Sequence, residues 1–208
     1  FPSVTDKVRF GGAVLNGGLM KISGGTIRNN NVGWRGAGIA SYGKIEMTGG
    51  TISGNYARNG WGDGGAIHLS GVKNDTGEDY TASDASYCTI SDGNFTNNKS
   101  DGAGGAVCAD GYSILYVKGG AFKNNAAATT GGGINVYSSC LRMSGGTISE
   151  NTAVSTNDST GNGGGLNLTV GSVADITGGT IENNQSNSGG GIYANGKSSF
   201  TASNLKIT

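Results

Sequence analysis

The sequence predicts an all-β fold, a single parallel β-helix (solenoid) with three short strands per coil and about seven coils over residues 1–208. Two glycine-rich phrases alternate along the chain at regular intervals. A short run of alternating apolar and polar residues separates them. No stretch of helical length shows the 3.6-residue period, and the shortest repeat spans about 25 residues, a length that fits three short strands per coil.

The first two strands of each coil are predicted from different patterns. The first strand follows the phrase Gly-(Gly/Ala)-x-(Ile/Val/Leu), whose apolar residue is Val14, Ile39, Ile67, Val107, Ile134, Leu166 and Ile192 in turn. The second is an apolar–polar–apolar run, as at 45–47, 88–90, 141–143 and, more loosely, 173–176. This alternation is the period of a strand with one buried face.

The third strand is predicted from the phrase Gly-Gly-x-(Ile/Phe)-x-x-Asn. Its isoleucine or phenylalanine is expected to point inward, and its glycines to form a corner where a Cβ would clash or φ must be positive. The phrase ends at Asn30, Asn55, Asn98, Asn125, Asn151 and Asn184. Because these asparagines share one position in the repeat, we expect their side-chain amides to hydrogen-bond in a ladder along the axis.

Insertions and chain ends complete the predicted organisation. Residues 70–87 and 152–162 lengthen two repeats and are expected to form side loops, where solenoids place recognition surfaces. Residues 1–10 are expected to cap the first coil, whereas FTASNLKIT at the C-terminus is strand-like and offers no polar cap. Either the natural protein continues, or copies of the chain stack end to end as filament subunits.

Composition and charge exclude several classes of protein. The chain has 42 Gly but 1 Pro and no Gly-X-Y period, which excludes collagen, and its regularly placed aliphatic residues argue against disorder. Lys+Arg and Asp+Glu both number 14 without a basic patch, so neither nucleic acid nor an anionic membrane is expected as a partner. No apolar run approaches the length needed to span a bilayer.

The repeats also carry a family resemblance. GGAV (11–14), GGAI (64–67) and GGAV (104–107), together with the phrases FTNN (95–98) and FKNN (122–125), resemble the GGA(I/L/V) and FxxN repeats of chlamydial polymorphic membrane proteins. More broadly, the chain from about Phe10 to Thr208 is similar to β-helix repeats of large bacterial surface proteins in the pectate-lyase-like superfamily. This resemblance implies a right-handed helix, an extracellular or cell-surface location and often a role in adhesion. Most repeats here have isoleucine in place of phenylalanine.

Many β-helices are polysaccharide lyases or hydrolases, in which acidic residues bind calcium or catalyse the reaction. The one dense acidic run, at Asp75, Glu78, Asp79 and Asp84, lacks the spacing of a calcium loop and is interpreted as a solvated loop. A glycosidase needs two carboxylates facing one sugar. Asp63, Asp101 and Asp110 lie at predicted corners and Glu46 and Glu182 on exposed strand positions, and the sequence singles out no pair. No catalytic residue, metal or cofactor is therefore predicted.

The single histidine and the cysteines allow further hypotheses. His68 follows Ile67 and is expected to point outward, with Cys108 beside it on the adjacent coil at about 5 Å between Cα atoms. A Cys–His pair in a nucleophilic site needs an orienting third group and a pocket, and a convex strand face offers no evident pocket. We therefore expect plain surface neighbours. Cys88 is expected in the core, and a Cys108–Cys140 disulfide is left open.

An aromatic corner is the leading candidate for binding. Trp34 precedes GAGI by two residues and Trp61 precedes GGAI by three, which places both at the same corner of successive coils near Arg35, Arg58 and Asp63. Two exposed indoles flanked by charges suit stacking on a sugar ring or anchoring of a protein. The alternative is that the indoles cover the corner or the N-terminal end of the coil.

Three functions follow from these patterns, in order of preference. The first is a non-enzymatic module of a bacterial surface protein, which binds a host or neighbouring-cell glycan or protein through the side loops or the aromatic corner. The second is a filament subunit that stacks coil on coil. The third is a carbohydrate-active enzyme, disfavoured because no acid–base or metal cluster is identifiable from the sequence.

Overall fold

The computed structural model describes residues 10–71, 86–155 and 160–208, which form an all-β chain with no helix. Within these residues there is accordingly no helix capable of crossing a membrane. The predicted N-terminal cap, apart from Phe10, the acidic run and most of the first predicted side loop fall on residues 1–9 and 72–85, outside the described part. Of the second predicted side loop, residues 156–159 lie outside it.

The strands belong to three sheets. The seven-stranded sheet contains β1 (Val14–Asn16), β5 (Ile39–Ser41), β8 (Ile67–Ser70), β11 (Val107–Asp110), β15 (Ile134–Tyr137), β19 (Leu166–Thr169) and β23 (Ile192–Ala194). The twelve-stranded sheet contains β2 (Leu19–Ile22), β3 (Thr26–Arg28), β6 (Lys44–Ser53), β9 (Tyr87–Thr96), β12 (Ile114–Val117), β13 (Ala121–Lys123), β16 (Cys140–Met143), β17 (Thr147–Ser149), β20 (Val173–Ile176), β21 (Gly179–Glu182), β24 (Ser199–Ala202) and β25 (Leu205–Ile207). The six-stranded sheet contains β4 (Asn31–Val32), β7 (Tyr56–Ala57), β10 (Lys99–Ser100), β14 (Ala126–Ala127), β18 (Thr152–Ala153) and β22 (Gln185–Ser186).

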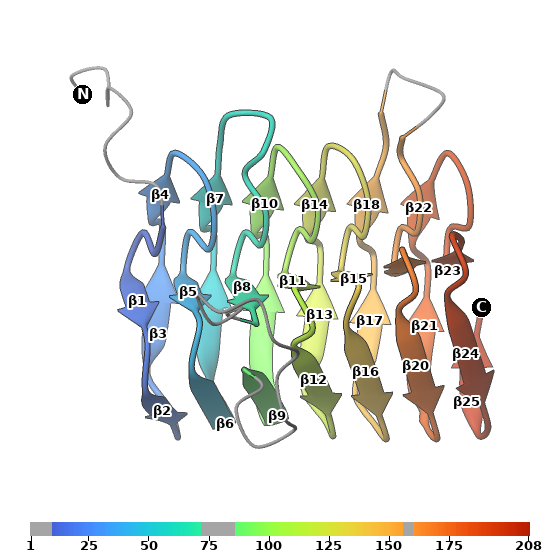
Figure 1. Cartoon of the computed structure of the whole chain (residues 1–208), viewed down its shortest axis with the longest axis horizontal. Helices are drawn as coiled ribbons and strands as arrows, with labels where there is room; N and C mark the ends of the chain where they lie inside the picture. The colour runs from blue at the N-terminus through green and yellow to red at the C-terminus, as the bar shows by residue number, and fades with distance from the viewer. Residues whose placement is uncertain (1–9, 72–85, 156–159) are drawn as a thin grey trace, which may run out of the picture.

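The chain visits the three sheets in the same order in successive repeats. From a strand of the seven-stranded sheet it enters the twelve-stranded sheet, then the six-stranded sheet, and then returns, so that neighbouring strands come from consecutive repeats (Figure 1). Strand neighbours pair in parallel, as β1 with β5, β10 with β14 and β17 with β21 do. The ten-residue strands β6 and β9 bend at an irregular register between Met47 and Thr51 and join the two arms of the twelve-stranded sheet.

The expected count of three strands per repeat is wrong in one respect. A fourth strand of two residues directly follows each ladder asparagine from Asn30 to Asn184 and builds the six-stranded sheet. Two residues are too few to show an alternating pattern, so sequence periodicity has no means of detecting such a strand.

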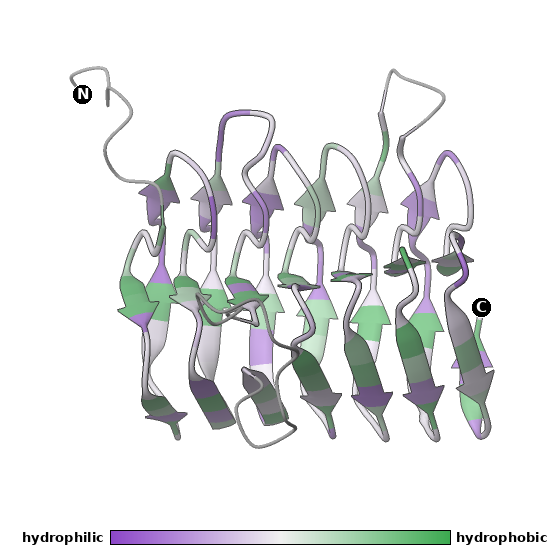
Figure 2. Cartoon of the chain, in the orientation of Figure 1, coloured by the Kyte–Doolittle hydropathy of each residue, from purple (hydrophilic) through white to green (hydrophobic). Residues whose placement is uncertain are grey.

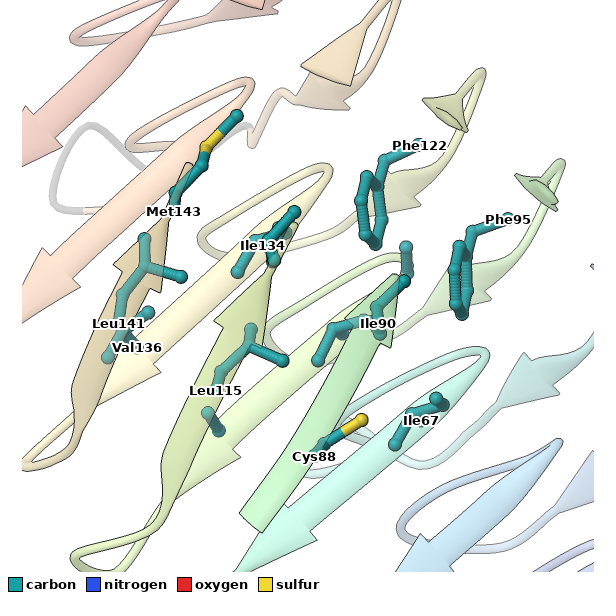
Figure 3. Close-up of a cluster of buried hydrophobic side chains, with 14 of the residues drawn as sticks. Ile67, Cys88, Ile90, Phe95, Leu115, Phe122, Ile134, Val136, Leu141 and Met143 are labelled. Carbon is teal, nitrogen blue, oxygen red and sulfur yellow. The ribbon is translucent and has the colours of Figure 1, made fainter. Parts of the chain in front are cut away.

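The core lies between the sheets and is continuous along the chain. The apolar residue of the third predicted strand stacks in register through Ile52, Phe95, Phe122, Ile148 and Ile181, all of which are buried. The rings of Phe95 and Phe122 lie nearly parallel, with centroids 4.6 Å apart (Figure 3). The hydropathy alternates along the strands in successive repeats (Figure 2). The inward direction expected for this position is therefore confirmed.

The six asparagines that end the phrases form a hydrogen-bonded row. Each side-chain amide from Asn30 to Asn151 donates to Oδ1 of the next asparagine at 2.9–3.0 Å. The backbone N–H of the same residue donates to the same oxygen. Asn55, Asn98, Asn125 and Asn151 are buried, so this row satisfies polar groups that water cannot reach.

The residue before each ladder asparagine has a left-handed backbone, with φ between 53° and 62°. It is asparagine in four repeats, glycine in one and Glu150 in another. Asparagine and glycine tolerate this conformation best, which explains the recurring Asn-Asn pair. The glycine pair of the phrase behaves as expected at Gly49 and Gly50, because a Cβ on Gly49 would lie 2.9 Å from the oxygen of Ser23 and Gly50 has φ of 102°.

The strands at the two ends of the described chain leave apolar side chains exposed. Leu15 and Leu19 are exposed in β1 and β2, and Phe200 and Ile207 in β24 and β25. End-to-end stacking of copies stays a prediction.

Candidate functional site

The middle of the outward row of the seven-stranded sheet is buried, contrary to expectation. Ala40, His68, Cys108, Asn135 and Asn167 pair in register on consecutive strands. None is more than 3% exposed, and His68 is fully buried. His68 and Cys108 are therefore adjacent, as the repeat register predicts, but the prediction that they are plain surface neighbours is wrong.

A cleft of about 390 Å³ lies over this row. Its lining includes Cys108, Asn135 and two exposed aromatic side chains, Trp61 and Tyr137. Trp61 is 75% exposed and Tyr137 is 47% exposed, so both rings are available to a ligand. The expectation that the strand face offers no pocket is thus also wrong, because polar and aromatic side chains from the corners and strand ends enclose the row.

Three charged side chains contribute to the cleft. Arg35, before β5, contacts two carboxylates: its Nη1 lies 3.3 Å from Oδ2 of Asp110, and its Nε lies 3.5 Å from Oδ2 of Asp63. Asp63 precedes β8, and its Oδ1 accepts the backbone N–H of Ala103 at 2.8 Å. Asp110 ends β11 and shares the face of Cys108, two residues earlier. The Arg35 guanidinium lies between two carboxylates, so the cleft contains both positively charged hydrogen-bond donors and negatively charged acceptors.

The two carboxylates have different environments. Burial raises the pKa of Asp63, and the hydrogen bond from Ala103 and the positive charge of Arg35 offset this only in part. Burial acts in the same direction on Asp110, but hydrogen bonds from His68 and Ser70 and the charge of Arg35 outweigh it and lower the pKa of this carboxyl. Opposite pKa shifts in neighbouring carboxyl groups are a feature of catalytic acid–base pairs, and structural ion pairs also produce them.

A potential metal-ligand set lies beneath these charges. One ligand atom each from Asp63, His68 and Cys108 lies within 4.8 Å of the other two. His68 Nε2 is 3.2 Å from Oδ2 of Asp110, whereas its Nδ1 has no hydrogen-bond partner within residues 10–71, 86–155 and 160–208. Burial, followed by the negative charges of Asp63 and Asp110, raises the pKa of the Cys108 thiol well above its usual value. Without a bound metal ion, this cysteine is a protonated thiol and a poor nucleophile at neutral pH.

The structure divides the residues of the predicted aromatic corner. Arg35, Trp61 and Asp63 line the cleft. Trp34 is half-buried and packs beside Phe10, with ring centroids 5.5 Å apart, so it differs from the expected exposed indole. Arg58 lies over the ring of Tyr56 at 5.0 Å. Of the two indoles of the predicted corner, only Trp61 lines the cleft.

Sequence reasoning missed Asp110, Asn135 and Tyr137 as members of one site. The repeat register contains a signal that could have identified them. Cys108 and Asn135 occupy the same position in the repeat as His68, and in a strand the residue two places later faces the same side of the sheet. Asp110 and Tyr137 occupy those later places. What the sequence does not reveal is the burial of this face.

All three cysteines are free. Cys108 lies on β11 and Cys140 on β16, strands of different sheets, so no Cys108–Cys140 disulfide is present. Cys88 is fully buried opposite Leu115, the inward position predicted for it, and burial raises the pKa of its thiol to about 12.

These environments predict an order of thiol reactivity. Under native conditions at pH 8, iodoacetamide is expected to modify the half-buried Cys140 first and to leave Cys88 unmodified until the protein unfolds, because both access and the thiolate fraction are minimal there. Timed alkylation followed by peptide mass spectrometry measures this order. Equal rates at Cys88 and Cys140 would contradict the burial of Cys88.

Comparison with known proteins gives no match to any family model, curated protein or solved structure.

Proposed function

We propose that this chain is a single right-handed parallel β-helix that serves as a non-enzymatic module of a bacterial surface protein and binds a glycan in the cleft at Trp61. The observation that carries the proposal is the position of this exposed indole beside the charged floor formed by Arg35, Asp63 and Asp110.

The β-helix is supported by the topology of the sheets. Consecutive repeats pair in parallel in all three sheets, as expected for a coil that advances by one strand spacing per turn. Connections between parallel strands of one sheet are right-handed in about 98% of cases, which supports the assigned hand. The resemblance to chlamydial surface repeats points the same way and supports an extracellular location.

The size and chemistry of the cleft favour a sugar over a protein as the ligand. A volume of about 390 Å³ lies in the range of small-molecule sites, whereas a stable protein interface requires a far larger area. Trp61 offers a flat apolar face for stacking, and Arg35 with its two carboxylates offers charged donors and acceptors for hydroxyl groups.

Replacement Trp61→Ala is expected to weaken glycan binding at least about tenfold, because loss of aromatic stacking costs roughly 1.4 kcal/mol. A glycan array probed with the labelled wild-type protein identifies a ligand, and titration of that ligand against both proteins measures the change. The side chain is 75% exposed, so we expect the variant to fold as the wild type does.

The matched control is Tyr112→Ala. Tyr112 is also an exposed aromatic residue, 58% accessible, but it is not among the residues that line this cleft. It should leave glycan affinity unchanged. An array without any bound glycan, or equal affinities of the wild type and Trp61→Ala, would sink the proposed function.

A hydrolase is the second candidate, favoured by the opposite pKa shifts of Asp63 and Asp110 in one cleft. In that case Asp63 is the proton donor and Asp110 the base or nucleophile. Release of reducing sugar from a glycan found on the array, abolished by Asp63→Asn, would establish this activity. Binding without any release would support the non-enzymatic function.

A further inference from the structure

We propose that Asp63, His68 and Cys108 form a binding site for a divalent transition metal of the zinc class at the floor of the cleft. The three side chains come from two adjacent strands, β8 and β11, and from the corner before β8. One ligand atom from each lies within 4.8 Å of the other two. This site goes beyond glycan binding and does not depend on it.

The environment of His68 is the first argument. Its ring is fully buried, and Asp110 lies 3.2 Å from Nε2. Because an ionised carboxylate only accepts hydrogen bonds, Nε2 is the donor in this contact, and in the neutral imidazole this leaves a lone pair on Nδ1. No group among the described residues hydrogen-bonds Nδ1. A histidine whose far nitrogen donates to a carboxylate is the usual arrangement of a metal ligand, and a bound ion would satisfy a nitrogen that is otherwise costly to bury.

The other two ligands are also held by neighbouring groups. Asp63 accepts the Ala103 N–H on Oδ1, which holds the carboxylate in place, and its Oδ2 lies 3.5 Å from Arg35 Nε. Cys108 Sγ lies 3.5 Å from the side-chain nitrogen of Asn135. In metal sites, supporting hydrogen bonds of this kind orient the ligands. Side chains that are adjacent only by chance need not have such bonds.

The donor set selects the kind of ion. One imidazole nitrogen, one sulfur and one oxygen suit zinc and related transition metals better than calcium or magnesium, which prefer oxygen alone. Ligand bonds of about 2.0–2.3 Å place donors roughly 3.3–3.8 Å apart around a tetrahedral ion. Each pair of ligand atoms therefore needs to approach by about 1.5 Å at most. The fourth position is available to water or a ligand oxygen, since Asp63 and Cys108 both line the cleft.

The first test uses Co²⁺ as a spectroscopic substitute for zinc. After treatment with a chelator, the protein is expected to bind one Co²⁺ with a sulfur-to-cobalt charge-transfer band in the near ultraviolet, and Zn²⁺ should displace it. Cys108→Ser, which preserves shape, should lose the band and bind Co²⁺ at least about tenfold more weakly. Cys140→Ser is the matched control, because Cys140 lies on β16 in another sheet, and it should keep both.

Asp110→Asn separates a metal site from a merely structural cluster. It removes the supporting carboxylate but no ligand, so metal affinity should fall about 10- to 100-fold while the sulfur band persists at saturating Co²⁺. Trp61→Ala should bind the metal normally even if it binds no glycan, which separates this inference from the proposed function. Circular dichroism of each variant verifies that the fold is retained.

The second test needs no variant. In the wild-type protein, Zn²⁺ should protect Cys108 from alkylation in mild denaturant while Cys140 reacts at an unchanged rate. A cobalt complex without the sulfur band, together with equal alkylation of Cys108 with and without Zn²⁺, would mean that ions bind elsewhere on the surface, and this would overturn the proposal.

Discussion

Replacement of Gly105 by alanine is expected to prevent stable folding or to lower the free energy of unfolding by about 4 kcal/mol or more, because the clash involves backbone that cannot move independently. An added Cβ would overlap the carbonyl oxygen of Gly132 and approach N and C of Ala126 to 2.6 and 2.7 Å. These atoms belong to the next repeat, whose position is set by parallel pairing of β11 with β15 and of β10 with β14. The effect is steric, since the φ of Gly105 lies outside the left-handed region.

Gly17→Ala is the matched control. Its Cβ would have no heavy atom within 4 Å and its φ also lies outside the left-handed region, so stability should remain within about 1 kcal/mol of the wild type or rise slightly. Urea denaturation followed by circular dichroism compares the two. A Gly105→Ala protein as stable as Gly17→Ala would show that neighbouring repeats are less closely packed at this corner than the structure indicates.

Asn125→Ala is expected to lower the free energy of unfolding by about 3–5 kcal/mol, because it leaves several buried polar groups without partners. The side-chain nitrogen of Asn125 donates to the carbonyl of Phe95 and to Asn151. Its Oδ1 accepts both the backbone and the side-chain N–H of Asn98. All four contacts are buried, so water cannot replace them without opening the coil.

The position of an asparagine along the row should determine how much its replacement lowers the free energy of unfolding. Asn30 lies at the start of the row and is only half-buried; its side chain donates to Asn55 and to the exposed carbonyl of Arg28. Asn30→Ala is therefore expected to cost about 1 kcal/mol, since water can satisfy the groups left behind. Equal losses in Asn30→Ala and Asn125→Ala, measured by urea denaturation, would mean that burial of the row contributes little to stability.

The repeat made much of the architecture predictable. Each phrase combines a strand period, an inward apolar residue and turn residues, and its recurrence determines which residues of consecutive repeats must align. The ladder and the buried stack of Phe95 and Phe122 follow directly from that alignment. The two-residue strands such as β7 were not predictable, because their pairing depends on where the preceding corner directs the chain.

The candidate site was only partly predictable for the same reason. The adjacency of His68 and Cys108 is a matter of register and was expected. Their burial was not, because it depends on side chains from other positions in the repeat, including Arg35 and Asp110, which come together at the cleft.

The sequence by itself determined the periodic features of this protein: parallel strands, an apolar interior, glycine corners and a row of asparagines. It did so because every repeat has the same local conformational preferences, and the stacking of consecutive repeats allows one register between their strands. Tertiary structure alone decided which outward positions are enclosed, which tryptophan is exposed and which charges meet over His68. Those outcomes depend on contacts between side chains of neighbouring coils that do not recur in the repeat. The local sequence pattern contains no information on such contacts.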